Sequence, residues 1–220
     1  MEKPNIEVKI CGIKDKRSLS AAIKYDADYI GFMFVEDSPR YIEPEKAKTL
    51  VEAESEDLRP AGRKLVAVMA DPSDKDLADV LSNFQPDIIQ LHGNETRERV
   101  REIAGVYDIR LMKALPVSNK KDVEAAKDWI GYADMLLFDA KSPDGQHGGK
   151  GKTFDWKLLD HLDIKMPWFL SGGLTIENVA EAIEVTGAKR VDVSSGVEKE
   201  RGEKDVVMMR QFIKAAKSVD

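Results

Sequence analysis

Cys11 and Asp139 are the residues of this sequence best suited to acid–base chemistry. Cys11, the single cysteine, ends a short β-type run in which alternation places it on the same strand face as Lys9. An ammonium group beside a thiol favours the thiolate, which can accept a proton or attack carbon. Asp139 follows three apolar residues at the end of another such run, where a carboxyl group kept protonated could act as a general acid. We therefore expect one proton acceptor and one proton donor.

Both residues also have a purely structural interpretation. A free cysteine is most often a small buried hydrophobe, and Asp139 could cap a helix or pair with Lys141. A third β-type run places Asp192 and Ser194 on one strand face. A thiol and two carboxylates that converge on one end of a sheet would indicate a site more strongly than any one of them.

Two glycine-containing segments predict an anion-binding site. They span residues 171–174 (Ser-Gly-Gly-Leu) and 194–196 (Ser-Ser-Gly), and each follows a β-type run and precedes a helix-like pattern. Glycines let backbone N–H groups approach an anion closely, and a helix N-terminus adds a favourable dipole. Either segment alone could be an ordinary tight turn, but together they favour a phosphorylated small molecule. The expected phosphate-binding residues are Gly172, Gly173, Ser194, Ser195 and Gly196.

The connection 141–152 contains a second glycine-rich segment. Its residues Gly-Gly-Lys-Gly-Lys-Thr at 148–153 superficially resemble a P-loop, but the spacing of glycines before the lysine is wrong for that motif. We expect instead a glycine-hinged lid over the site, with Gly148, Gly149 and Gly151 as the hinge residues. The aromatic segment 154–156 that follows should begin a helix.

Composition limits the class of protein. The chain has 220 residues, of which 42% are hydrophobic, and a net charge of −6, so one domain spanning 1–220 can bury a sizeable core. An acidic chain without a Lys/Arg block is a poor candidate for binding nucleic acid or an anionic membrane. One cysteine excludes an internal disulfide, and no Cys/His cluster has zinc-site spacing. Because neither a signal peptide nor a run of 18 apolar residues is present, we expect a cytoplasmic protein.

Strand and helix patterns alternate along the whole chain. Strand–helix repetition requires crossover connections and therefore a parallel sheet. Eight strands give about 27 residues per unit, close to the roughly 30 of a βα unit, which favours a single-domain (β/α)8 TIM barrel with outer helices. An open doubly wound sheet is the alternative, but no GxGxxG follows the first strand. The strand candidates are Glu7–Ile10, Tyr29–Phe34, Lys64–Met69, Asp87–Leu91, Arg110–Ala114, Met135–Phe138, Trp168–Leu170 and Arg190–Val193, and the clearest helices are Asp74–Phe84, Thr96–Val106 and Ile176–Thr186.

Six segments, in order along the chain, point to one family. They are Lys9-Ile10-Cys11-Gly12; Gly31-Phe32 with Ser38-Pro39-Arg40-Tyr41-Ile42; Gln90-Leu91-His92-Gly93; Asp139 before Gly148–Trp156; Ser171-Gly172-Gly173-Leu174; and Val191-Asp192-Val193-Ser194-Ser195-Gly196-Val197-Glu198. Together they resemble the successive motifs of the phosphoribosylanthranilate isomerases of tryptophan biosynthesis. The matches cover nearly the whole chain, and the first and fourth segments are the most specific.

The resemblance implies an Amadori rearrangement of N-(5-phosphoribosyl)anthranilate to 1-(2-carboxyphenylamino)-1-deoxyribulose 5-phosphate, with no metal and no cofactor. By the same match, Asp139 is the general acid that opens the ribose ring and Cys11 is the general base that removes the C2 proton. Arg40 would bind the anthranilate carboxylate, a task for a planar two-pronged donor, although a surface salt bridge is its structural alternative. The remaining expected substrate-binding residues are Lys9, Gln90, His92 and Asp192.

Three other functions stay open on the residues alone. Indole-glycerol-phosphate synthase would need inward lysines on several strands, and only Lys9 and Lys113 are candidates. A pentose-phosphate epimerase would normally hold a metal with His and Asp ligands, and the three histidines are scattered. A non-catalytic phosphometabolite-binding protein would not need both Cys11 and Asp139. No pattern identifies an interface, so a homo-oligomer and association with other tryptophan-pathway enzymes both stay open.

Overall fold

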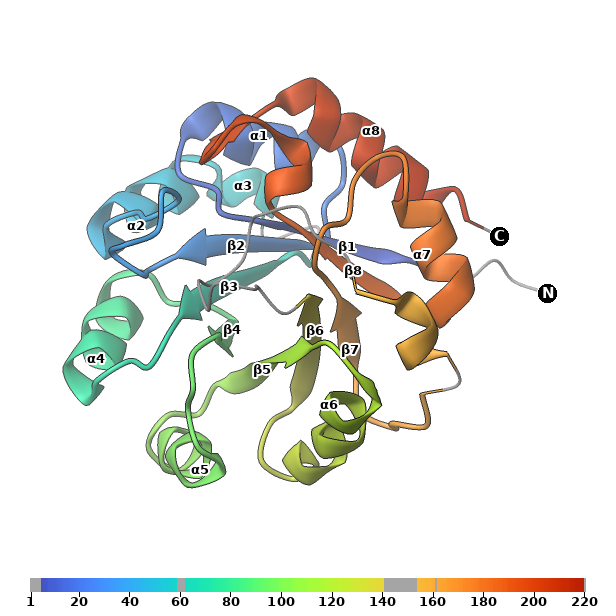
Figure 1. Cartoon of the computed structure of the whole chain (residues 1–220). Helices are drawn as coiled ribbons and strands as arrows, with labels where there is room; N and C mark the ends of the chain where they lie inside the picture. The colour runs from blue at the N-terminus through green and yellow to red at the C-terminus, as the bar shows by residue number, and fades with distance from the viewer. Residues whose placement is uncertain (1–4, 59–61, 141–153, 161, 220) are drawn as a thin grey trace.

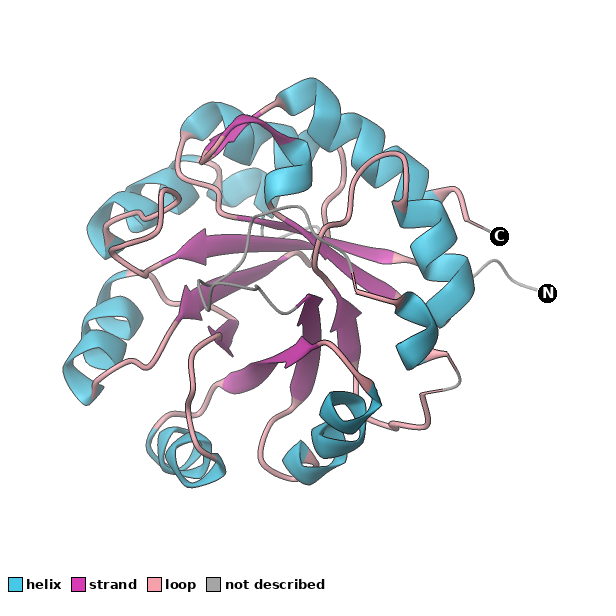
Figure 2. Cartoon of the chain, viewed as in Figure 1, coloured by secondary structure: helices cyan, strands magenta, loops and turns pink. Residues whose placement is uncertain are grey.

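The computed structural model describes residues 5–58, 62–140, 154–160 and 162–219, and eight parallel strands in it close into a barrel (Figure 1). The predicted (β/α)8 barrel is therefore confirmed. Its strands run in chain order around the barrel, and helices surround them (Figure 2). The strands are β1 (Glu7–Cys11), β2 (Tyr29–Met33), β3 (Lys64–Met69), β4 (Ile88–Leu91), β5 (Arg110–Val117), β6 (Met135–Ala140), β7 (Trp168–Leu170) and β8 (Arg190–Val193).

Most helices begin at a side chain that caps their first free N–H groups. Ser73 and Asn119 each form a reciprocal capping box, and Thr96 accepts from the N–H of Arg99. The helices are α1 (Lys16–Lys24), α2 (Pro44–Ala53), α3 (Ser55–Leu58), α4 (Asp74–Asn83), α5 (Arg97–Val106), α6 (Lys120–Ala125), α7 (Val179–Thr186) and α8 (Val206–Lys217), with 3-10 turns η1 (Ala126–Trp129), η2 (Trp156–Leu159) and η3 (Ser195–Val197). A short hairpin, β9 (Glu198–Glu200) and β10 (Glu203–Lys204), lies between η3 and α8.

Strand alternation divides the core into two clusters. The inward residues of the strands form the barrel interior, which includes Cys11, Val68, Leu137 and Phe169. The outward residues pack against the helices in a larger cluster. As a result, every second position near a strand's carboxyl end points toward the barrel axis.

Lys113 does not have the expected inward position. It shares its strand face with Leu111 and Leu115, both of which belong to the outer cluster. Its ammonium group contacts Glu95 Oε2 at 2.9 Å and lies 5.6 Å from the centre of the Trp129 ring. Its carbonyl acceptors at Leu91 and Gly93 flank His92, so Lys113 supports the β4 loop from outside the barrel.

Three aspartates tie odd-numbered strands to the even-numbered strands that follow them. Asp28, Asp87 and Asp134 directly precede β2, β4 and β6. Each carboxylate accepts, at 2.8 Å, a backbone N–H near the start of the preceding strand; the donors are Val8, Leu65 and Leu111. Lys189 stands directly before β8.

Replacing Asp28 with alanine should lower the free energy of unfolding by about 1–3 kcal/mol, because it leaves the N–H of the fully buried Val8 without its acceptor. Urea denaturation followed by circular dichroism would measure the change. The control is Lys189→Ala at the exposed matching position before β8, for which we expect a change within about 0.5 kcal/mol. Equal changes in the free energy of unfolding for the two substitutions would show that the hydrogen bond of Asp28 does not stabilise the fold.

Candidate active site

A cavity of about 550 Å³ opens at the carboxyl ends of the barrel strands. Its size is within the usual range for small-molecule sites. Apolar side chains from β2 and β3, including Met33 and Val68, line part of its wall. The predicted site residues that line the cavity are Cys11, Arg40, Gln90, His92, Asp139, Gly172, Gly173, Asp192, Ser194, Ser195 and Gly196. The expected lid residues Gly148, Gly149 and Gly151 lie outside the described residues.

Lys9 is the exception among the predicted substrate contacts. Its side chain has no exposed surface, and its ammonium group lies 2.8 Å from Asp192 Oδ1. The second oxygen of Asp192 accepts from the Ser171 hydroxyl at 3.1 Å. The expectation that Lys9 binds substrate directly is therefore wrong: it lies beneath the cavity and acts on the site only through Asp192 and Cys11.

The protonation of Cys11 also differs from the expectation. Burial raises the pKa of its thiol above the ordinary value, the charge of Lys9 acts in the opposite direction, and Asp192 raises the pKa further. Since Asp192 already pairs with Lys9, that ammonium group cannot by itself produce a thiolate. The raised pKa favours the neutral thiol over the thiolate.

Asp139 contacts His92, the residue that follows β4. Its Oδ2 lies 3.3 Å from His92 Nε2, and Gln90 Nε2 lies 2.8 Å from His92 Nδ1. The three residues form a chain of polar contacts along the cavity wall. Among the described helices and turns none begins at Asp139, and the turn that begins at Trp156 is capped by Asp155.

Gly172 allows β7 and β6 to approach closely beside Asp139. Its φ is +87°, and a Cβ at this position would lie 2.3 Å from the Ala140 nitrogen and 2.9 Å from Asp139 Oδ1. A side chain there would displace the carboxyl group. Only glycine fits this conformation and this space.

The two glycine-containing loops lie side by side after β7 and β8. A Cβ at Gly196 would lie 1.9 Å from the carbonyl oxygen of Leu174, so the loops are in contact. Within the described part of the chain, the N–H groups of Gly172 and Gly173 have no protein acceptor. These N–H groups are available to an anion.

The helices behind these loops begin later than the sequence suggested. α7 begins at Val179, because residues 176–178 form a turn. The second loop leads into η3 and the β9–β10 hairpin, so α8 begins only at Val206. A helix does follow the loop after β7, whereas η3 and the hairpin separate the loop after β8 from α8. Backbone N–H groups are therefore the available anion donors.

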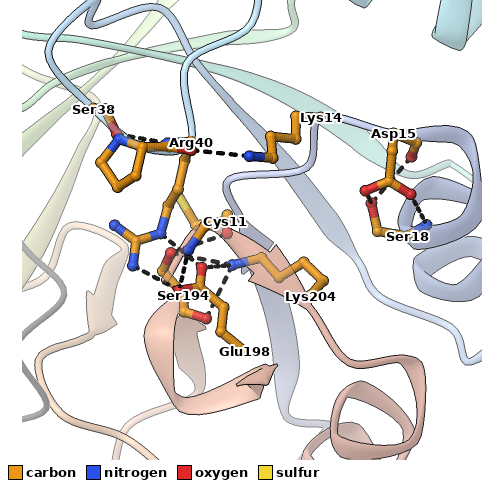
Figure 3. A network of polar contacts seen from close by, with 11 residues as sticks. Cys11, Lys14, Asp15, Ser18, Ser38, Arg40, Ser194, Glu198 and Lys204 are labelled. Carbon is orange, nitrogen blue, oxygen red and sulfur yellow. Dashed lines mark hydrogen bonds and ion pairs between the residues drawn. The ribbon is translucent and has the colours of Figure 1, made fainter. Parts of the chain in front are cut away.

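Arg40 forms a buried ion pair that sequence reasoning missed. Its Nε donates to Glu198 Oε1 at 2.7 Å and its Nη2 to Glu198 Oε2 at 2.9 Å (Figure 3). Nη1 is not engaged by any residue that the structure describes. Glu198 closes the sixth family-like segment, but nothing local in the sequence distinguishes it or Lys204 from solvated surface charges. Both become apparent only when β2 and the hairpin are brought together.

Two further properties bear on the class of protein. Within the described ranges, no group of three or more His, Cys, Asp or Glu residues is arranged to hold a metal ion. Every helix in those ranges is too short or too polar to cross a membrane.

The closed parallel barrel, with a thiol on β1 and a carboxyl group on β6 facing one cavity, is that of a (β/α)8-barrel enzyme. A model of the family "N-(5'phosphoribosyl)anthranilate (PRA) isomerase" matches residues 8–215. The chain belongs to this family of PRA isomerases.

Individual relatives agree with this assignment. The N-(5'-phosphoribosyl)anthranilate isomerase of Paramagnetospirillum magneticum is 46% identical over 214 residues, with 96% of this chain and 97% of the relative covered. The enzyme of Rhizobium etli is 45% identical over 218 residues, with 97% and 95% covered.

Solved structures extend the comparison to the fold. The phosphoribosyl anthranilate isomerase of Thermotoga maritima has a TM-score of 0.86 and 40% identity, with 97% of this chain and 100% of that chain covered. A second isomerase structure, in complex with reduced 1-(o-carboxyphenylamino)-1-deoxyribulose 5-phosphate, has a TM-score of 0.82 and 37% identity, with the same coverage. A T. maritima relative at 38% identity and the same coverage is described as dimeric, with a TM-score of 0.82 for its monomeric form.

Proposed function

We propose that Asp139 and Cys11 are the general acid and the general base of a PRA isomerase. Family membership makes the chain an isomerase of tryptophan biosynthesis. The observation that carries the assignment of roles is that both side chains line one cavity, from β6 and β1, on either side of the β7 and β8 loops. A small sugar phosphate held by those loops would have the donor and the acceptor on opposite sides.

The two anionic groups of the substrate have separate binding regions. The free N–H groups of Gly172 and Gly173, with the loop 194–196, would hold the phosphate. Arg40 Nη1 would donate to the anthranilate carboxylate, because the other two guanidinium nitrogens are already bonded to Glu198. A similar isomerase has been solved in complex with a compound that carries both of these groups.

Ring opening begins at Asp139. Its proton goes to the ribose ring oxygen as the C1–O bond breaks, and the anthranilate nitrogen lone pair forms the C1=N bond of an iminium. Cys11, as thiolate, then removes the C2 proton, and the electron pair forms an enolamine. Tautomerisation gives the C2 ketone. In total, C1 and the former ring oxygen each gain one proton, while C2 and its hydroxyl each lose one.

The reaction also requires Cys11 to lose its proton after substrate has entered. Lys9 and Lys204 are the positive charges that lower the pKa of the thiol, against the effect of burial. We further propose that residues 1–220 form one domain and that this domain works in the cytoplasm. Its partner is the phosphorylated substrate, without nucleic acid or membrane.

The direct test is a steady-state assay in which freshly prepared PRA loses its fluorescence. We expect the purified chain to convert PRA and to restore growth of a bacterial strain that lacks this isomerase on medium without tryptophan. A non-catalytic phosphometabolite-binding protein would bind the substrate but leave its fluorescence decay at the uncatalysed rate. That result would reject the proposed function.

Arg40→Ala should raise KM about 10- to 100-fold and change kcat much less, since the lost charged hydrogen bond acts on ground state and transition state alike. Arg40→Lys keeps the positive charge but not the planar set of N–H donors, and should restore only part of the affinity for PRA. Circular dichroism would confirm folding, because Glu198 loses its partner. An unchanged KM in a folded Arg40→Ala protein would show that Arg40 does not bind the substrate.

A further inference from the structure

Arg40, Glu198 and Lys204 form a buried ionic network at the edge of the cavity (Figure 3). The exposed fractions of the three side chains are 5%, 4% and 1%. Glu198 Oε1 accepts from Arg40 Nε and from Lys204 Nζ, both at 2.7 Å. A single carboxylate therefore joins the two cations.

Lys204 extends this network to the phosphate end of the cavity. Its ammonium group donates to the Ser194 carbonyl oxygen at 2.9 Å and contacts the Ser194 hydroxyl at 3.2 Å. That hydroxyl donates to the carbonyl oxygen of Cys11 at 3.1 Å. Figure 3 shows the resulting path from Arg40 to the loop after β8 and to the end of β1.

The hairpin tip fixes the same segment from the other side. The Gly202 N–H donates to Glu198 Oε2 at 2.9 Å. Gly202 has a φ of +83°, and a Cβ there would lie 2.5 Å from the Pro39 carbonyl oxygen. The hairpin is therefore pressed against the residue that precedes Arg40.

The cationic partners of Glu198 favour its ionised form. Burial alone would raise the pKa of Glu198, but the hydrogen bond from Arg40 and the charge of Lys204 outweigh it and lower the pKa to about 2. Burial lowers the pKa of Lys204, and the charge of Glu198 acts in the opposite direction.

We propose that Glu198 and Lys204 are positioning residues that set the spacing between the carboxylate-binding and phosphate-binding ends of the site. Glu198 orients the Arg40 guanidinium so that Nη1 faces the cavity, and Lys204 holds Ser194 in the phosphate loop. This inference rests on the proposed function. A stabilising role alone would not need three buried charges, because apolar residues of similar volume hold a buried contact at least as well.

The central test is a double-mutant cycle on KM for PRA. Glu198→Gln keeps the side-chain volume but removes the charge, and should raise KM about 10- to 100-fold, as expected when a binding group is misplaced. In an Arg40→Ala background the same substitution should change KM less than about twofold, because Glu198 acts through Arg40. Equal KM effects in both backgrounds, or no KM effect in the parent, would overturn the proposal.

A control removes the same charge from an ion pair between two strands, far from the cavity. Glu7 pairs with Arg190 at the start of β1 and β8, at the opposite end of the barrel from the cavity. Glu7→Gln should leave KM and kcat at the parental values while lowering stability. If it raised KM as much as Glu198→Gln, the effect of Glu198 would be one of general stability, and the proposal would fail.

Lys204 is tested through inorganic phosphate binding by titration calorimetry. Lys204→Met should weaken phosphate binding at least about tenfold, and Lys204→Arg should restore most of it, since it keeps the charge. If Lys204→Met does not fold, the double variant Glu198→Gln/Lys204→Met, which removes both charges, replaces it. Parental phosphate affinity in a folded variant without the ammonium group would overturn this half of the proposal.

Failure of the proposed isomerase function can be distinguished from failure of the positioning role of Glu198 and Lys204. A parent chain without PRA turnover would reject the proposed function, and the KM cycle would then be replaced by the binding of anthranilate and of inorganic phosphate. Glu198→Gln should still weaken anthranilate binding, and Lys204→Met should still weaken phosphate binding. Unchanged affinities for both ligands would reject the positioning role itself.

Discussion

Cys11→Ser should lower kcat by about 10²- to 10⁴-fold, the range for loss of an acid–base group. An alcohol is far less acidic than a thiol, so serine cannot supply the anion that removes the C2 proton. Burial raises the pKa of Cys11, which favours the protonated thiol. Its kcat/KM should therefore rise as the pH increases through the neutral and alkaline range, and Cys11→Ser should lose that rise.

The variant should keep its fold and bind a product analogue with nearly parental affinity, since the change affects one buried atom. Turnover near the parental value would mean that Cys11 is only a core residue. Asp192 would then be the first candidate for the proton acceptor. Both of its oxygens are already bonded, to Lys9 and to Ser171, which makes it a poor base in this arrangement.

Asp139→Asn should also lower kcat by about 10²- to 10⁴-fold. The amide has the shape of the carboxyl group and can still contact His92, but it cannot transfer a proton to the ring oxygen. Steady-state kinetics would show the loss in kcat, and titration with a product analogue should show nearly parental binding. Folding is checked by circular dichroism, because Asp139 lies against Gly172.

Parallel loss of kcat and of analogue affinity in this variant would indicate a misplaced substrate and not a missing proton. A parental kcat in Asp139→Asn would show that Asp139 is not the general acid. His92, which contacts the same carboxyl group, would then be the nearest other group able to give a proton.

The inward site residues could be predicted from sequence because strand alternation has a period of two. That rule placed Cys11 and Asp192 on the inner face, and the structure has them lining the cavity. The eight strands were predicted to within a few residues for the same reason. Lys113 was misplaced because its apolar neighbours on both faces conceal the alternation of β5.

The charge pairing of the site could not be predicted. Lys9 pairs with Asp192, and Arg40 with Glu198, across separations of 183 and 158 residues. In a chain with 34% charged residues, no local pattern selects these partners. The activation of Cys11 was misjudged for this reason, since the neutralising carboxylate for Lys9 comes from β8.

Aspartate bonds join β1 to β2, β3 to β4 and β5 to β6, but in the described residues no such bond joins β7 to β8. Lys189 stands where the aspartate would be, and β7 pairs with β8 through a single residue pair, Leu170 with Val191. The loops proposed to hold the phosphate leave the barrel from these two strands. A phosphate bound by both loops would connect β7 with β8. Binding of the phosphate and pairing of these two strands would then be thermodynamically linked. The bound substrate would then stabilise the pair of strands that the polypeptide joins through one residue pair.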